Sequence, residues 1–77
     1  MRFFFHVRDV ETYEEDLEGT DLPSLEAAIT EARQSAREMV AELVLQDAVV
    51  DGRLFEIANE NGDILEIIKF KDVVRME

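Results

Sequence analysis

The side chains of this chain that could perform chemistry are one histidine and a run of acids near its start. His6 is the only histidine, and seven acids follow it: Asp9, Glu11, Glu14, Glu15, Asp16, Glu18 and Asp21. A general base needs a partner within hydrogen-bond reach, and a metal site usually needs three or four ligands, so the acids would have to come from a neighbouring strand. We favour a structural or surface histidine beside a solvated acidic edge that resists aggregation. The sequence therefore predicts no metal site and no cofactor.

No catalytic or phosphate-binding motif accompanies this histidine. The chain has no P-loop, dinucleotide-binding glycine pattern, serine nucleophile elbow or HExxH, and the EF-hand pattern fails around both Gly52 and Gly62. It also has no cysteine, which excludes disulfides, thiolate ligands and cysteine nucleophiles. We therefore predict that the protein is not an enzyme, and an enzyme that uses His6 and the acids is the last of three functional hypotheses.

Length and charge narrow the class of protein further. The chain has 77 residues, 47% of them hydrophobic, and a formal net charge of −11. These values predict a single small domain over residues 1–77 with a thin core. The charge repels nucleic acid and would favour a basic protein partner. The apolar start is too short for a secretory signal or a membrane span, so we expect a cytoplasmic protein that does not bind membranes.

Four strands are predicted, two before and two after one helix in the sequence. Residues 3–8, FFFHVR, form a strand by their aromatic and β-branched content, with Phe3, Phe5 and Val7 on one face and Phe4, His6 and Arg8 on the other. A short polar edge strand around residues 11–15 would pair back on it. The last two strands, RLFEIAN and DILEIIKF, are separated by ENG, and Asn61-Gly62 is a strong hairpin signal.

The stretch EGTDLPSLEAA, residues 18–28, predicts the start of the helix. Gly19 permits a turn, Pro23 favours an extended residue before it, and Ser24 can accept a bond from an N–H in the first turn. From Leu25 to about Leu45, apolar residues recur at helical spacing: Leu25, Ala28, Ile29, Ala32, Ala36, Met39, Val40 and Leu43. QDAVVDG is predicted to end the helix, and residues 71–77 to form a charged tail or a short terminal turn.

Together these elements predict an α+β fold of ββαββ order, a mainly antiparallel four-stranded sheet with one long amphipathic helix packed on one face. Numbering the strands along the chain, the order is either 2-1-3-4, all antiparallel, or 2-1-4-3, with one parallel pair. In the last strand Ile64, Ile68 and Phe70 would share a face.

The opposite sheet face would expose an apolar patch, and such patches mark interfaces. The candidate interface consists of Phe4, His6, Leu54, Leu65 and Ile67. We therefore predict a homodimer or a bound protein partner, and a register error of one residue would remove the argument.

Three motifs, FFFHVRD, EGTDLPSLEAA and DGRLFEIANENGDIL, together resemble a family of small single-domain proteins of unknown function found in rhizobia and related alphaproteobacteria. The resemblance covers nearly the whole chain. Ser24 stands where the family often has Asp, and Lys69 where it often has Pro. The resemblance implies no catalytic or binding residue.

Two non-enzymatic hypotheses follow. The first is a cytoplasmic interaction module that self-associates or binds a protein partner through the uncovered sheet face or an exposed edge. The alternative is an antitoxin-like binder of a basic protein, because the strand pair, the acidic loop, DLP and the Ala/Glu-rich helix are distantly similar to the partner-neutralising domain of HicB-type antitoxins. The chain lacks a DNA-binding appendage of the kind such antitoxins carry.

Overall fold

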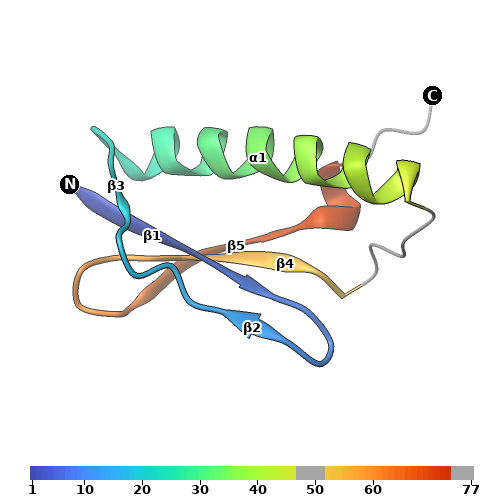
Figure 1. The fold of residues 1–77 in the computed structure, drawn as a ribbon. Helices are drawn as coiled ribbons and strands as arrows, with labels where there is room; N and C mark the ends of the chain where they lie inside the picture. Colours follow the sequence, from blue (N-terminus) through green and yellow to red (C-terminus); the bar gives the residue numbers. More distant parts are fainter. Residues whose placement is uncertain (47–51, 74–77) are drawn as a thin grey trace.

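A computed structural model describes residues 1–46 and 52–73, in which a long helix lies along one face of an antiparallel sheet (Figure 1). The elements are β1 (Arg2–Arg8), β2 (Tyr13–Glu14), β3 (Thr20–Asp21), α1 (Leu25–Leu45), β4 (Leu54–Ala58), β5 (Ile64–Lys69) and the 3-10 helix η1 (Phe70–Val73). The sheet order is β2-β1-β4-β5, and β3 also pairs with β1. The α+β prediction is confirmed, and the all-antiparallel order is the correct one of the two.

Strand β1 lies inside the sheet, because other strands pair along both of its edges. It pairs with β4 from Phe4 opposite Ala58 to Arg8 opposite Leu54. Its other side is shared by two short strands, β2 beside Val7 and β3 beside Phe3. Phe3 is buried against the helix, so β1 fixes both the core and the outer face of the sheet.

The sheet has five strands, one more than the four predicted. Strand β2 is confirmed in place but has only two residues, and Thr20–Asp21, part of the stretch that predicts the helix start, forms β3. Between them the chain leaves β1, and the Asp16 carboxylate accepts a hydrogen bond from the Phe5 N–H at 3.1 Å. That bond takes the place of a strand partner, and two-residue strands carry no periodicity that a sequence could reveal.

Helix α1 begins and ends at the predicted residues. Ser24 has an extended backbone (φ −160°) and its Oγ accepts from the Ala27 N–H at 3.1 Å, as an N-cap does. The buried side chains of the helix are small: Ala28, Ala32, Ala36 and Val40. Small residues let the helix approach the sheet closely. Most of QDAVVDG lies outside the described residues.

The hairpin of β4 and β5 is confirmed, with a loop of residues 59–63. Asn59 Oδ1 accepts from the N–H groups of Asn61 (3.0 Å) and Asp63 (2.9 Å), which closes the turn. A β-bulge interrupts the pairing: Ile57 lies opposite Glu66, but Ala58 lies opposite Ile64.

Because of the bulge, the prediction that Ile64 shares a face with Ile68 is wrong. Ile64 shares the face of Ala58, away from the helix, while Ile68 stays opposite Phe55 on the helix face. The extra residue shifts the alternation by one, and the sequence pattern gave no sign of it.

Of the two alternatives predicted after the last strand, a charged tail or a short terminal turn, the described residues show the short turn. Phe70 N–H donates to the Arg53 carbonyl at 3.0 Å, and η1 follows. Phe70 and Val73 are buried in the same core as α1 and β4, and the Phe55 and Phe70 rings lie 5.1 Å apart. Residues 74–77 lie outside the described part of the chain.

Candidate functional site

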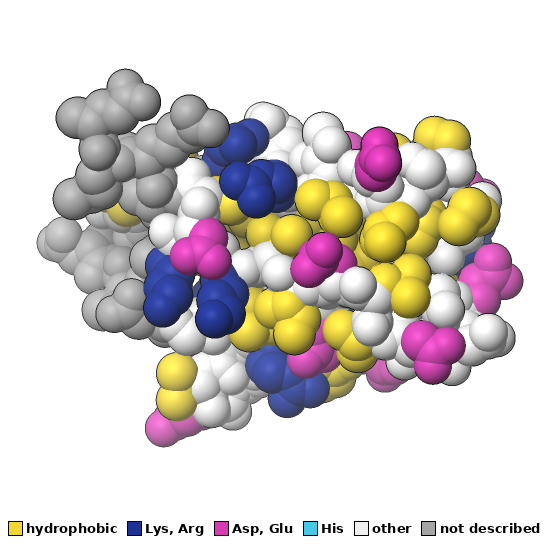
Figure 2. Space-filling view, turned by 180° about the vertical axis from the view of Figure 1, so that it is seen from behind, with side chains coloured by type: hydrophobic (Ala, Val, Ile, Leu, Met, Phe, Trp, Pro, Cys, Tyr) yellow, Lys and Arg dark blue, Asp and Glu magenta, His cyan; other side chains and the backbone are white. Residues whose placement is uncertain are grey.

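Two side chains of the predicted interface, Leu65 and Ile67, are exposed along β5, together with Ile64, which was not predicted there. Ile64 and Ile67 are each 47% exposed and Leu65 is 38% exposed. Seen from behind, the molecule carries hydrophobic side chains across the middle of its surface, with Lys and Arg side chains gathered toward one end (Figure 2). Three exposed branched aliphatics within four residues form a surface that water solvates poorly.

The backbone of β5 is open on the side away from β4. Among the described strands β5 pairs only with β4. Ile67 N–H donates to the side chain of its neighbour, Glu66 Oε1, at 3.2 Å. The backbone N–H and C=O groups of Ile67 thus point away from β4, because successive residues of an edge strand point these groups alternately toward the neighbouring strand and away from it. We define the open edge as residues 64–69 on this side.

The rest of the predicted patch is interrupted by charge. Phe4 and Leu54 are half-buried, and Arg8, which lies opposite Leu54, forms an ion pair with Glu56 at 2.8 Å. The Arg8 guanidinium also lies 4.4 Å from the centroid of the Tyr13 ring, a cation–π contact. The uncovered sheet face is therefore not the continuous apolar surface that strand alternation predicted.

His6 is only 8% exposed, which fits the structural one of the two predicted alternatives, although His6 was also placed in the candidate interface. Its Nδ1 accepts from the Asp16 N–H at 3.0 Å, and this arrangement places the proton of the neutral ring on Nε2. The ring stacks beside Phe4 with centroids 6.4 Å apart. His6 is held by the acidic segment and takes no part in the open edge.

Asp16 organises the edge opposite β5. Its Oδ1 accepts from the N–H groups of Glu18 (3.2 Å) and Gly19 (3.1 Å), while Oδ2 accepts from Phe5. Burial acts to raise the pKa of the Asp16 carboxyl, but these N–H bonds together lower that pKa below its usual value. The sequence did not single out Asp16, since it is one of seven acids in the same stretch.

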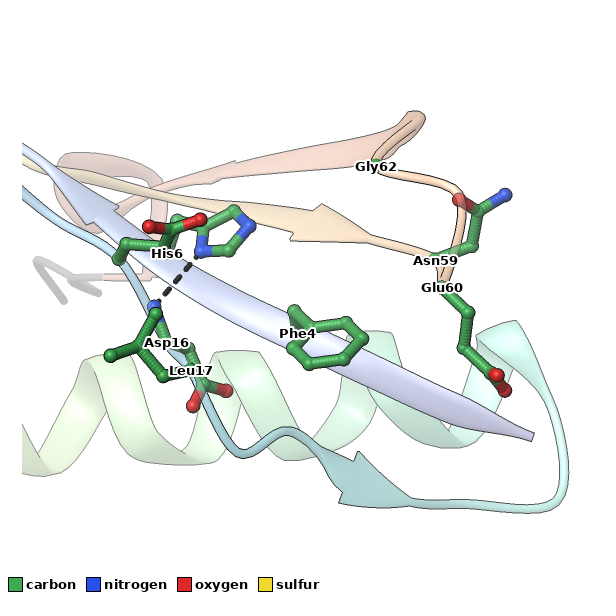
Figure 3. Close-up of a pocket in the computed structure, with 8 residues that line it drawn as sticks. Phe4, His6, Asp16, Leu17, Asn59, Glu60 and Gly62 are labelled. Carbon is green, nitrogen blue, oxygen red and sulfur yellow. Dashed lines mark hydrogen bonds between the residues drawn. The ribbon is translucent and has the colours of Figure 1, made fainter.

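A pocket of about 200 Å³ lies on the uncovered face beside His6. Asp16 and Leu17 lie on one side of β1, and the hairpin loop lies on the other (Figure 3). The pocket is lined by Phe4, His6, Glu15, Asp16, Leu17, Asn59, Glu60 and Gly62. Its walls combine aromatic rings with carboxylates, which suits a cation-bearing group.

Other chemistry finds little support in residues 1–46 and 52–73. No group of three or more His, Asp or Glu side chains there lies close enough to hold a metal ion. Within the same ranges, no helix is both long and apolar enough to cross a membrane.

These features define a small α+β domain with a helix-covered sheet, one edge closed by an acidic loop and one edge open. The chain belongs to the family described as "Domain of unknown function (DUF6894)", whose model matches residues 2–71. No curated protein and no solved structure matches the chain.

Proposed function

We propose that this protein is a non-enzymatic interaction module that binds another protein chain by adding a strand to β5. The observation that carries the proposal is the open edge, where no second strand of residues 1–46 or 52–73 pairs with β5 beside the exposed Ile64, Leu65 and Ile67. In strand addition the backbone bonds supply affinity, and the alternate side chains supply specificity.

The contrast with ordinary edge strands supports this proposal. Natural proteins shorten, charge or cover an exposed edge, because open edges promote aggregation. Strand β5 contains two charged residues, Glu66 and Lys69, but its other exposed side chains are aliphatic and lie along the open edge. A partner strand would pair the backbone and cover these side chains.

Cross-linking in cells tests the proposal. A photoreactive benzoylphenylalanine replaces Ile67, and in a control variant it replaces Glu31, which is exposed on α1. The host is an alphaproteobacterium, the origin that the sequence resemblance predicts, with the protein in the cytoplasm as expected. We expect a discrete protein adduct from position 67 only. Equal adducts at both positions, or none at position 67, contradict the proposal.

A second candidate, binding of a basic protein as an antitoxin does, is favoured by the pocket beside His6. Glu15 and Glu60 line it with the Phe4 ring, and Nε2 of His6 points away from Asp16 toward it (Figure 3). The volume is below the roughly 300–1,000 Å³ of small-molecule pockets, so the pocket suits one Arg or Lys side chain. The net charge of −11 would attract a basic surface.

A matched pair of ligands tests this second candidate. Amide chemical shifts are followed by NMR while acetyl-arginine methylamide, or its neutral analogue acetyl-citrulline methylamide, is added. We expect the arginine compound alone to shift Asp16 and Gly62, and Glu60→Gln to weaken that response while Glu31→Gln leaves it unchanged. Equal responses to both compounds would rule the candidate out.

A further inference from the structure

We infer that the strand added to β5 is β5 of a second copy of this chain, antiparallel to the first, about a two-fold axis at Ile67. The inference rests on the proposed function, because it names the occupant of the open edge. It follows from the direction of the backbone groups, from the register they allow and from the charges along the strand.

The backbone direction restricts which residues can pair. Phe70 N–H bonds to the carbonyl of Arg53, the residue before β4, and Ile67 N–H points outward to the Glu66 side chain. Since hydrogen bonding alternates along an antiparallel strand, residues 66, 68 and 70 bond inward. Residues 67 and 69, and 65 beside the bulge, present their groups to the outside. A second strand must bond to those residues.

The side chains select one register. With the axis at Ile67, the two Ile67 side chains meet, and Leu65 lies opposite Lys69 of the second copy. With the axis at Glu66, the two carboxylates would face each other, which destabilises a strand pair. With the axis at Ile68, the strand end before η1 would limit the pairing to residues 67–69, whereas the axis at Ile67 allows residues 65–69 to pair.

The charges along β5 complement themselves in this arrangement. Asp63 stands before the strand, Lys69 ends it and Lys71 follows in η1. Antiparallel pairing brings the basic end of each copy to the acidic end of the other. The acids of residues 9–21 lie in and around β2 and β3, on the other edge. The open edge is thus where two chains of net charge −11 can approach with the least repulsion.

Sedimentation equilibrium of the full chain over a wide concentration range tests for the dimer. We expect a dimer for the wild type and for Val44→Glu, a control at a 63% exposed helix position. For Ile67→Glu we expect the dissociation constant of the dimer to rise about 100-fold, because two carboxylates would meet at the axis. Circular dichroism establishes that each variant is folded. A wild type that is monomeric throughout, or equal weakening by both substitutions, overturns the inference.

Single cysteines test the register, because the natural chain has none. Under mild oxidation, Ile67→Cys should form a disulfide-linked dimer. Leu65→Cys alone should not, since its two copies would lie about 13 Å apart along the strands. A mixture of Leu65→Cys and Lys69→Cys should form the mixed disulfide. A disulfide from Leu65→Cys alone, or none from Ile67→Cys, overturns the register.

The cross-linking experiment separates the two proposals. An adduct from position 67 to a different protein, with a monomeric wild type, overturns the self-pairing inference and leaves the interaction module standing. No adduct at position 67 with a monomeric wild type contradicts both.

Discussion

The two edges of this sheet differ in how the outward backbone N–H and C=O groups find hydrogen-bond partners. Beside β1, two-residue strands and the Asp16 carboxylate satisfy the backbone from within the chain. Along β5, the Ile67 N–H donates to the carboxylate of the neighbouring Glu66, and aliphatic side chains are exposed. The first edge is closed by hydrogen bonds from within the chain, and the second has no further strand partner among the described residues. The difference teaches that an acidic residue, Asp16, has a structural role at one edge, whereas the binding that we propose is at the other.

Removing the Asp16 carboxylate should have the largest effect, because it opens the closed edge. Asp16→Ala leaves the N–H groups of Phe5, Glu18 and Gly19 without their acceptor. We expect a loss of about 3 kcal/mol in the free energy of unfolding, since bonds to a charged group contribute roughly 1.5–3 kcal/mol each and do not add fully. Urea denaturation measures it. Glu15→Ala, the exposed neighbour, should change stability by less than about 0.5 kcal/mol. Equal losses in both variants would remove the special role of Asp16.

Gly19→Ala should damage the same edge through sterics. Gly19 has φ +73°, and an added Cβ would lie 2.9 Å from the Phe3 carbonyl oxygen and from the Phe4 ring. We expect a loss of about 2 kcal/mol or more, because the left-handed conformation and the backbone clash both oppose alanine.

Gly62→Ala is the matched control for this glycine. Gly62 also has a positive φ, +85°, but an added Cβ there meets nothing within 4 Å. We expect about 1 kcal/mol, from the conformation alone. Thermal or urea unfolding compares the two, and an equal cost would show that the contact with β1 does not matter.

Acid should weaken the closed edge. The pKa of Asp16 is lowered in the folded protein, so its contribution is complete above the unfolded value of about 3.9 and is lost as pH falls through the folded value. We expect the stability advantage of the wild type over Asp16→Asn to shrink as the pH is lowered below about 4. Urea midpoints between pH 7 and pH 2.5 measure this difference, and an advantage that does not change with pH would contradict the assignment.

Substitution at the open edge should have the smallest effect on the folded monomer. Ile67 is 47% exposed, and its side chain is absent from the core. At concentrations low enough to keep the chain monomeric, Ile67→Lys should change the free energy of unfolding by less than about 0.5 kcal/mol. Urea denaturation tests this, and a loss as large as that of Asp16→Ala would erase the distinction between the edges.

Several elements could be predicted because their causes are local. The helix from Leu25 to Leu45 follows from the spacing of its apolar residues and from the Ser24 cap. The hairpin follows from Asn61-Gly62, and the face shared by Phe3, Phe5 and Val7 follows from strand alternation. Each depends on residues a few positions apart, where side-chain period and backbone preference act directly.

The tertiary structure decided the features that depend on residues distant in the sequence. Asp16 closes an edge because Phe5 lies beside it, and His6 is buried because residues 13–16 cover it. The bulge at Ala58 turns Ile64 away from the helix, and Phe70 and Val73 join a core formed by earlier elements. Composition and periodicity determined that a helix covers an antiparallel sheet. Which edge stays open was decided only by the pairing of strands in the folded chain. Asp16 is one of seven acids in its stretch, and it acquires its structural role from the backbone N–H groups that lie beside it.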